Sequence, residues 1–362
     1  MNINFKPEDW ARIEKTHMDF WNGELDRPLL FLNRKREKPW PELPYAPSFW
    51  PELPKELSSE EVIMRYEAQL EAQEGWIGDD FPKQWVNFGP GIAAGFLGAK
   101  VGVAPNTIWF DPAEEKKISE IFPVFDRDNY WWKRIIELTT IAAERWKDKA
   151  CIGYTDIGGN LDIVASLRGT QDLLFDCMDE PEEVQRVCNE VTKIWIKMFD
   201  ELAAIIEPNG CGNTPWAPIW AKSGTTTYML QSDFCYMISP AMFEEFVLPD
   251  MYASCDAIDI PFYHLDGKGE LPHLDMLIDI PKLAGIQWVS GDGAPPAHDW
   301  MDILAKIKNG GKKCQISTTP EGAKKVVKEL GGKGFILQVS GDMTPQEAID
   351  FQEMLRKENC GK

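Results

Sequence analysis

The stretch that decides the fold is residues 258–267, which read Ile-Asp-Ile-Pro-Phe-Tyr-His-Leu-Asp-Gly. Its mostly apolar first part is typical of a buried strand, although Pro261 removes one backbone donor from the ladder. Because side chains alternate between the two faces of a strand, His264 and Asp266 should lie on one face at its C-terminal end. The C-terminal edge of a parallel sheet is where α/β proteins place their polar binding and catalytic residues. We therefore treat the rest of the chain as the frame around this pair.

Strand and helix patterns alternate through residues 126–362 at intervals of roughly 20 to 35 residues, which favours a parallel sheet. The expected strands are 29–32, a segment near Trp85 or Ile108, 151–155, 225–230, 258–266, 285–289, 314–318 and 334–339. The expected helices are 7–22, 58–73, 128–147, 182–206, 240–248, 271–280, 299–308, 320–330 and 345–357.

About eight strands is the number that a closed barrel requires. We therefore predict the α/β class and a single (β/α)8 TIM barrel domain over residues 1–362, with an N-terminal helical and Pro/Trp-rich extension. In this prediction residues 1–125 form a decorated N-terminal part, and residues 126–362 form the regular strand-helix alternation.

The composition is that of a globular protein, with 44% hydrophobic and 27% charged residues. A formal net charge of −20 argues against nucleic acid as a partner, since phosphate binding requires clustered Lys and Arg. No run approaches the about 18 apolar residues of a membrane span, and charged residues interrupt the N-terminus where a signal peptide would have its apolar core. The eight cysteines form no CxxC pair, which indicates a reducing compartment. We expect a cytoplasmic protein with neither nucleic acid nor membrane as a partner.

The Pro/Trp-rich stretch 38–54 predicts an ordered excursion over the barrel mouth or a subunit contact, because its aromatic residues would be costly to leave exposed. The chain has 15 tryptophans, most of which we expect in the core or in subunit contacts, so a homodimer is among the expectations. The glycine-rich segment 87–98 lacks the Lys-Ser/Thr of a phosphate loop. It is either a turn region that lines the site or a structural loop.

Polar residues gather at the C-terminal ends of successive predicted strands: Asp156, then Gln231 and Asp233, then His264 and Asp266, then Asp292 and Ser340. In a barrel these ends meet on one face. Carboxylates near an imidazole can hold a metal such as Zn²⁺ or orient the imidazole for proton transfer. A strand-end Asp can also cap the following helix or accept hydrogen bonds from loop amides, and both interpretations stay open for Asp156, Asp233 and Asp292. The tryptophans near strand ends, which could line an apolar pocket, are Trp216, Trp220 and Trp288.

Five stretches resemble the uroporphyrinogen decarboxylase-like superfamily of β/α barrels, and the pattern is nearest to its corrinoid-dependent methyltransferases. They are Thr-Asp-Ile-Gly-Gly at 155–159, Leu-Arg-Gly at 167–169, Asp-Glu-Pro at 179–181, Ile-Ser-Pro-Ala-Met-Phe-Glu-Glu-Phe at 238–246 and His-Leu-Asp-Gly at 264–267. The resemblance runs from Arg27-Pro28 to the C-terminus, and it is more specific for the fold than for the reaction.

The methyltransferases of this superfamily bind zinc through a His-x-Cys pair at a strand end and a second Cys near the last strand. The pair here reads His264-x-Asp266, and the late position falls near Ser340 without a thiol. The resemblance therefore implies a harder metal site, with His264, Asp266 and Asp292 as ligands, that suits an ether or hydroxyl oxygen better than a thiol. Cys235 and Cys314 are possible substitutes that we interpret as small core residues.

The resemblance thus predicts a methyltransferase of the O-demethylase component type. It would move a methyl group from a small methylated substrate, such as an aromatic ether, to a corrinoid on a partner protein. We expect His264, Asp266 and Asp233 to be catalytic, and zinc to be the metal. The expected substrate-binding residues are Asp156, Gln231, Trp216, Trp220 and Trp288. The alternatives are a metal-free decarboxylase or lyase of a small carboxylate, in which His264 and a nearby Asp move protons, and a non-catalytic ligand-binding protein.

Overall fold

A computed structural model describes residues 1–38, 57–104 and 107–359. Its strands are β1 (Leu29–Arg34), β2 (Ile77–Gly78), β3 (Lys83–Trp85), β4 (Lys100–Ala104), β5 (Thr107–Asp111), β6 (Cys151–Gly153), β7 (Asn213–Thr214), β8 (Thr227–Leu230), β9 (Ile260–Asp266), β10 (Gly285–Val289), β11 (Lys313–Thr318) and β12 (Phe335–Met343). Apart from Lys38, the predicted excursion over 38–54 lies outside the described residues.

The helices are α1 (Pro7–Trp21), α2 (Ser59–Ala72), α3 (Ala93–Phe96), α4 (Tyr130–Arg145), α5 (Asn160–Arg168), α6 (Thr170–Asp179), α7 (Pro181–Ile206), α8 (Pro240–Phe246), α9 (Leu248–Ala257), α10 (Leu274–Ile278), α11 (Met301–Asn309), α12 (Pro320–Leu330) and α13 (Pro345–Asn359). Short 3-10 helices occur between them, among them η3 (Asp233–Met237), which follows β8. Among the described helices, none is long and apolar enough to cross a membrane.

The strands form two mainly parallel sheets. The larger has the order β2-β1-β12-β11-β10-β9-β8, and only β2 runs antiparallel to its neighbour. The smaller has the order β3-β6-β7 and is parallel throughout. The predicted mixed α/β class with a mainly parallel sheet is therefore confirmed.

One of the two candidate segments for the early strand was wrong. Trp85 lies in β3, which pairs parallel with β6. Ile108 lies in β5, which forms a separate antiparallel hairpin with β4. The two runs have similar β propensity, and only the long-range partner decides which of them joins the parallel sheet.

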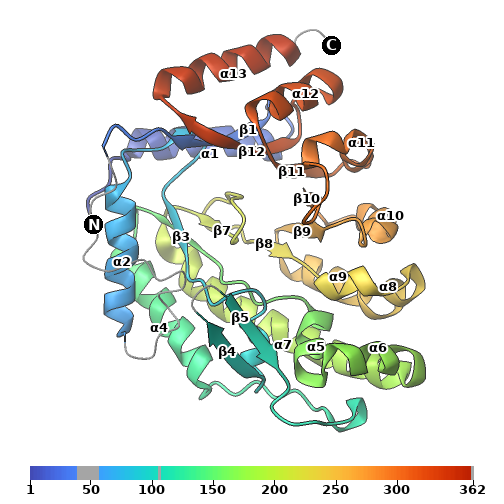
Figure 1. The fold of residues 1–362 in the computed structure, drawn as a ribbon. Coiled ribbons are helices and arrows are strands. Elements are labelled where there is room, and N and C mark those ends of the chain that lie inside the picture. Colours follow the sequence, from blue (N-terminus) through green and yellow to red (C-terminus); the bar gives the residue numbers. More distant parts are fainter. Residues whose placement is uncertain (39–56, 105–106, 360–362) are drawn as a thin grey trace.

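The helices surround the strands in chain order. Figure 1 shows α2 and α4 followed by α5, α6, α8, α9, α10, α11, α12 and α13 along the outside, while the strands of the two mainly parallel sheets lie on the inner side. The smaller sheet continues toward the larger one at β7, where the Asn213 side chain bonds to the backbone just before and within β8. Its Oδ1 accepts from the Thr227 amide at 3.2 Å, and its Nδ2 donates to the Thr225 carbonyl at 2.7 Å.

Strand β9 shows that the sheet is buried on both faces. Tyr263 and Leu265 belong to the large core cluster that contains the helix-facing residues. Phe262, on the opposite face, belongs to a second and smaller cluster that also holds Leu29 and Ile336. Helix α1 adds residues to this inner cluster and so covers the end where the strands begin. The inner face is therefore apolar at the start of the strands, which leaves their C-terminal ends for polar side chains.

Helix starts follow the expected capping rules. The Ser58 hydroxyl accepts from the Glu61 amide at the start of α2, and the Glu61 carboxylate accepts from the Ser58 amide in return. Thr319 caps α12 in the same way by accepting from Gly322, with Pro320 in the first turn. Helices α5 and α6, which the sequence pattern did not predict, meet at Gly169, whose φ of 99° breaks what would otherwise be one helix.

A buried ion pair fixes the start of β1. Arg27 donates through Nη1 to Asp79 Oδ2 at 2.6 Å and through Nη2 to Asp79 Oδ1 at 2.8 Å. The same carboxylate accepts from the Leu30 amide at 2.9 Å, and Asp79 is only 1% exposed. A bidentate pair with a third hydrogen bond offsets the desolvation of both charges.

Replacement of Asp79 by Ala should therefore destabilise the protein strongly, by about 3 to 5 kcal/mol, because it leaves the Arg27 guanidinium buried without its partner. Urea unfolding followed by circular dichroism measures the change. The matched control is Lys282→Ala, which breaks the exposed Lys282–Asp256 pair and should shift stability by less than about 1 kcal/mol. Equal effects of the two substitutions would contradict the role given to Asp79.

Candidate functional site

Three potential metal ligands lie together at the C-terminal ends of two neighbouring strands. Asp233 begins η3 shortly after the end of β8, and His264 and Asp266 lie at the C-terminal end of β9. One ligand atom from each side chain lies within 4.8 Å of the others, and His264 Nε2 is 4.0 Å from Asp266 Oδ2. The two-residue spacing on β9 places His264 and Asp266 on the inner face, as the sequence predicted.

A chain of buried amides sets the orientation of the His264 ring. The Pro218 carbonyl can only accept, so Gln315 must donate to it through Nε2, at 2.9 Å. Gln315 Oε1 then accepts from Gln287 Nε2 at 2.9 Å. This leaves Gln287 Oε1 to accept from His264 Nδ1 at 2.5 Å. Neutral His264 therefore carries its proton on Nδ1 and presents the lone pair of Nε2, which is the form that binds a metal.

The amide chain follows the strand register. His264 pairs with Gln287 between β9 and β10, and Gln287 pairs with Gln315 between β10 and β11. Gln287 is 7% exposed and Gln315 is fully buried, so unpaired amides here would be costly. Trp216 packs edge-on against the imidazole, with ring centroids 5.1 Å apart. The ring is thus held by hydrogen bonds on one side and by an aromatic contact on another.

Two further carboxyl groups, Asp162 and Glu270, lie close enough to Asp233 to interact with its charge. Burial raises the pKa of Asp162 to about 7, although Asp162 accepts hydrogen bonds from the amides of Asp233 and Phe234. Desolvation also raises the pKa of Asp233, which the nearby His264 lowers in part. Burial and the surrounding carboxylates raise the pKa of Glu270 to about 10. A bound cation would relieve this accumulation of negative charge.

Glu270 also has an incomplete hydrogen-bond set. Tyr263 Oη lies 3.3 Å from Glu270 Oε2, whereas Oε1 is buried and has no partner among the described residues. A carboxyl group in this state is protonated at neutral pH, because its pKa is well above 7. It adds hydrogen-bonding capacity beside the site without adding charge.

Asp156 and Gln231 lie next to the three ligand candidates. Asp156 is buried and accepts from the Gly158 amide at 2.8 Å. Gln231 is buried as well and lines a pocket of about 280 Å³ that also contains Asp162 and Asp233. The structure therefore brings Gln231 to the same pocket as Asp233, and Asp156 is close enough to interact with both of these side chains.

The three predicted tryptophans have separate locations. Trp216 contacts His264, as described above. Trp220 is buried in the inner core cluster and donates through Nε1 to the Cys211 carbonyl at 2.9 Å. Trp288 is fully buried on the helix-facing side of β10, where it packs against Trp300. We therefore keep only Trp216 as a candidate for substrate contact.

The third ligand candidate is Asp233, and Asp292 is outside the group. Asp292 and Asp266 line another pocket of about 280 Å³, but Asp292 is not among the three side chains whose ligand atoms converge. The seven described cysteines are all free and buried. Burial raises the pKa of the Cys235 and Cys314 thiols well above their usual range, so neither supplies a thiolate.

Sequence reasoning missed Gln287, Gln315, Asp162 and Glu270. The first two had a signal, since each is an amide flanked on both sides by apolar residues of a strand, Ile-Gln-Trp in β10 and Cys-Gln-Ile in β11. A buried amide needs a partner, and two such residues on neighbouring strands can satisfy each other. Asp162 lies in the first turn of α5, a helix that the sequence pattern did not predict.

Together these features define an α/β protein with a polar site on the C-terminal edge of a parallel sheet. No protein-family model and no curated protein matches the chain by sequence. The fold is similar to that of a methyltransferase from Methanosarcina mazei, with a TM-score of 0.58 and 12% identity over 96% of this chain and 98% of that one. A B12-independent methionine synthase from Shewanella sp. W3-18-1 matches less well, with a TM-score of 0.39 and 11% identity over 63% of this chain and 68% of that one. At these identities the first similarity shows the fold alone.

Replacement of Gln287 by Leu should abolish the preference of neutral His264 for the tautomer with its proton on Nδ1, because the acceptor for Nδ1–H is lost. In ¹⁵N-edited spectra at neutral pH, His264 of the parent should show a protonated Nδ1, and the variant should show a mixture in which the Nε2–H form is substantial. Gln338→Leu, on the same face of the same sheet but outside the amide chain, is the matched control. An unchanged tautomer in Gln287→Leu would contradict the amide relay.

Asp156 should make stability depend on pH. Burial and the nearby Asp233 raise its pKa to about 7, although hydrogen bonds from Gly91, Gly158 and Gln231 favour the charged form. Because the unfolded pKa is about 3.9, this group destabilises the fold progressively as pH rises from about 4 to about 7. Asp156→Asn should therefore gain stability over the parent by on the order of 1 to 3 kcal/mol more at pH 8 than at pH 5. Unfolding curves at both pH values measure this, and a difference that does not vary with pH would refute it.

Proposed function

We propose that this chain is a methyltransferase that moves a methyl group from a small methylated substrate to a corrinoid carried by a partner protein. The observation that carries the proposal is the convergence of Asp233, His264 and Asp266 at the C-terminal edge of the sheet. The similarity of fold to a methyltransferase supports it. The corrinoid and the demethylase type of reaction rest on the sequence resemblance, with Asp266 in the position of a thiolate ligand.

We further propose that the two sheets are arcs of one (β/α)8 barrel that forms a single domain. The inner core cluster supports this, because it combines Phe262 and Ile336 of the larger sheet with Cys151 of the smaller one. The link through Asn213 and the ring of outer helices in Figure 1 also support it. In this arrangement β7 is an insertion between the barrel strands β6 and β8.

The three side chains fit a borderline cation such as Zn²⁺. They offer one imidazole nitrogen and two carboxylates, a donor set that zinc accepts. The amide chain already presents the lone pair of His264 Nε2. The ligand atoms lie within 4.8 Å of one another, so small side-chain rotations would bring them to the spacing of about 3.3 Å that zinc bond lengths near 2 Å imply. The buried and unpartnered Glu270 oxygen lies in the same acidic surroundings.

The protein's own residues would hold the reacting groups in place. Gln287 and Gln315 keep the His264 ring from turning, and Trp216 shields its edge from water. The pocket beside Asp233 has the apolar walls Phe110, Phe234 and Met237, which suit a small methylated compound. A bound metal would supply Lewis-acid stabilisation of the oxyanion that remains when the methyl group leaves.

The metal and the transfer can be tested together. Protein purified without chelators should contain stoichiometric metal by mass spectrometry, and His264→Ala and Asp266→Ala should lose it. With a reduced corrinoid protein and a panel of methyl ethers and methylamines, the parent should convert Co(I) to methyl-Co(III), and both variants should be slower by about 100-fold or more. The change in cobalt absorbance measures the rate.

Asp292→Asn is the matched control, because Asp292 shares a pocket with Asp266 but is not in the group of three. It should retain metal and activity. Full activity of metal-free parent protein would refute the metal centre. A flat response across the whole panel would refute methyl transfer to a corrinoid.

One observation favours a second candidate function. A carboxyl group with a pKa near 7 is suited to general acid-base chemistry, and Asp162 has one beside Asp233. This would serve a metal-free decarboxylase or lyase in which His264 and Asp233 move protons. Release of CO₂ from a small carboxylate that persists after chelation would favour this candidate over methyl transfer.

A further inference from the structure

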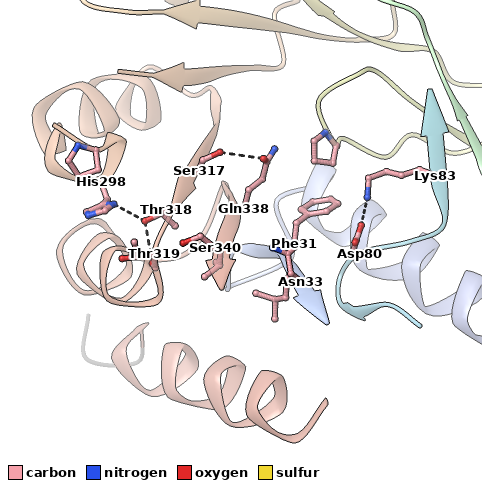
Figure 2. A pocket seen from close by; sticks show the side chains of 14 residues that line it. Phe31, Asn33, Asp80, Lys83, His298, Ser317, Thr318, Thr319, Gln338 and Ser340 are labelled. Atoms are coloured by element: carbon pink, nitrogen blue, oxygen red, sulfur yellow. Dashed lines mark hydrogen bonds and ion pairs between the residues drawn. The ribbon is translucent and has the colours of Figure 1, made fainter. Parts of the chain in front are cut away.

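A third cavity opens on the same edge of the sheet, in addition to the two pockets described above. Its volume is about 500 Å³, within the range of small-molecule pockets. It lies at the C-terminal ends of β1, β11 and β12, as Figure 2 shows, whereas the ligand group lies on β8 and β9. None of its lining residues belongs to the ligand group.

The strand register builds one wall of this cavity. Ser317 of β11 pairs with Gln338 of β12, and Gln338 pairs with Phe31 of β1. All three side chains line the cavity, and Ser317 donates to Gln338 Oε1 at 3.4 Å. They form a row two residues beyond Gln315, so the cavity begins where the buried amide chain ends.

Most of the polar lining is neutral. Asn33, Thr319 and Ser340 add to Ser317 and Gln338, and Figure 2 shows them around one opening. Thr318 adds a hydroxyl that is hydrogen-bonded to His298 Nδ1 at 2.9 Å. Hydroxyl and amide groups can both donate and accept, which matches a ligand with several hydroxyl groups.

The two oppositely charged side chains of the lining neutralise each other. Lys83 and Asp80 form an ion pair, marked by a dashed line in Figure 2. The Lys83 ammonium also lies over the Phe31 ring, 5.4 Å from its centroid. An anionic ligand would have to compete with Asp80, and a cationic ligand would have to compete with Lys83. The charge pattern thus disfavours both.

Apolar walls complete the cavity. Phe31, Pro218 and Pro296 line it alongside the polar groups. Rings of this kind pack against the C–H faces of a cyclic ligand, while its hydroxyl groups reach the amides and hydroxyls.

We propose that this cavity binds a neutral, hydroxyl-rich ligand, a cyclic polyol or a sugar of one or two rings. The assignment rests on the neutral hydrogen-bonding row, the internally paired charges and the apolar walls. It stands whether or not the chain transfers methyl groups, because it uses none of the metal-ligand candidates.

Isothermal titration calorimetry on the full chain tests the proposal with glucose, maltose and myo-inositol as neutral probes. Glucuronate is the anionic probe and glucosamine the cationic one. At least one neutral probe should bind saturably, and glucuronate and glucosamine should bind at least tenfold more weakly than that probe. No binding of any neutral probe, or tighter binding of a charged one, would overturn the proposal.

Variants locate the binding site. Gln338→Leu and Ser317→Ala should each weaken binding of the neutral probe at least tenfold, and circular dichroism should confirm that they fold. Because Ser317 is exposed, Ser317→Ala keeps the test valid if Gln338→Leu fails to fold. Thr170→Ala, which alters the pocket beside Asp233, is the matched control and should bind normally, as should His264→Ala. Normal binding by both cavity variants, or loss of binding in His264→Ala, would contradict the assignment.

Discussion

Burial of the parallel strands on both faces decides where a polar side chain can lie in this protein. On β9 the outward residues Tyr263 and Leu265 pack in the helix-facing core, and the inward residue Phe262 packs in the inner core. A polar group on the inner face must therefore be fully hydrogen-bonded or stand at the C-terminal edge, where the inner core ends. Gln287 and Gln315 meet the first condition, and Asp266 meets the second. The candidate site lies where these two conditions meet, at His264.

The same constraint explains the chemical character of the site. The described cysteines are buried as thiols, so the candidate ligand atoms at the strand ends are carboxylate oxygens and an imidazole nitrogen. Oxygen ligands make a harder site than thiolates do. The Pro218 carbonyl, which can only accept, determines the direction of every hydrogen bond up to the imidazole. The tautomer of His264 thus depends on a backbone group three hydrogen bonds away, which leaves the Nε2 lone pair free to accept.

The parts that could be predicted from sequence are those that depend on short-range periodicity. The two-residue period placed His264 and Asp266 on one face, and the alternation of strand and helix indicated a parallel sheet. The same period could have placed Trp288 on the face opposite to Gln287, since the two are neighbours in β10. The sequence could not show that Asp233, and not Asp292, is the third member of the group with His264 and Asp266. Both residues follow strands, and only the arrangement of η3 brings Asp233 to His264. The proposed neutral cavity was missed for a similar reason, since Phe31, Ser317 and Gln338 meet only through register.

The C-terminal edge of the sheet has two halves that differ in charge, one rich in carboxyl groups and one mainly neutral. Around β8 and β9, carboxylates exceed the positive charges available to them, and burial with mutual repulsion raises their pKa values. Around β1, β11 and β12, Lys83 and Asp80 cancel each other and the remaining groups are mainly neutral. A neutral ligand can enter the second half without separating an ion pair, whereas the first half gains most from a cation. Pro218 joins the halves, because its ring lines the neutral cavity while its carbonyl orients the amides that hold His264.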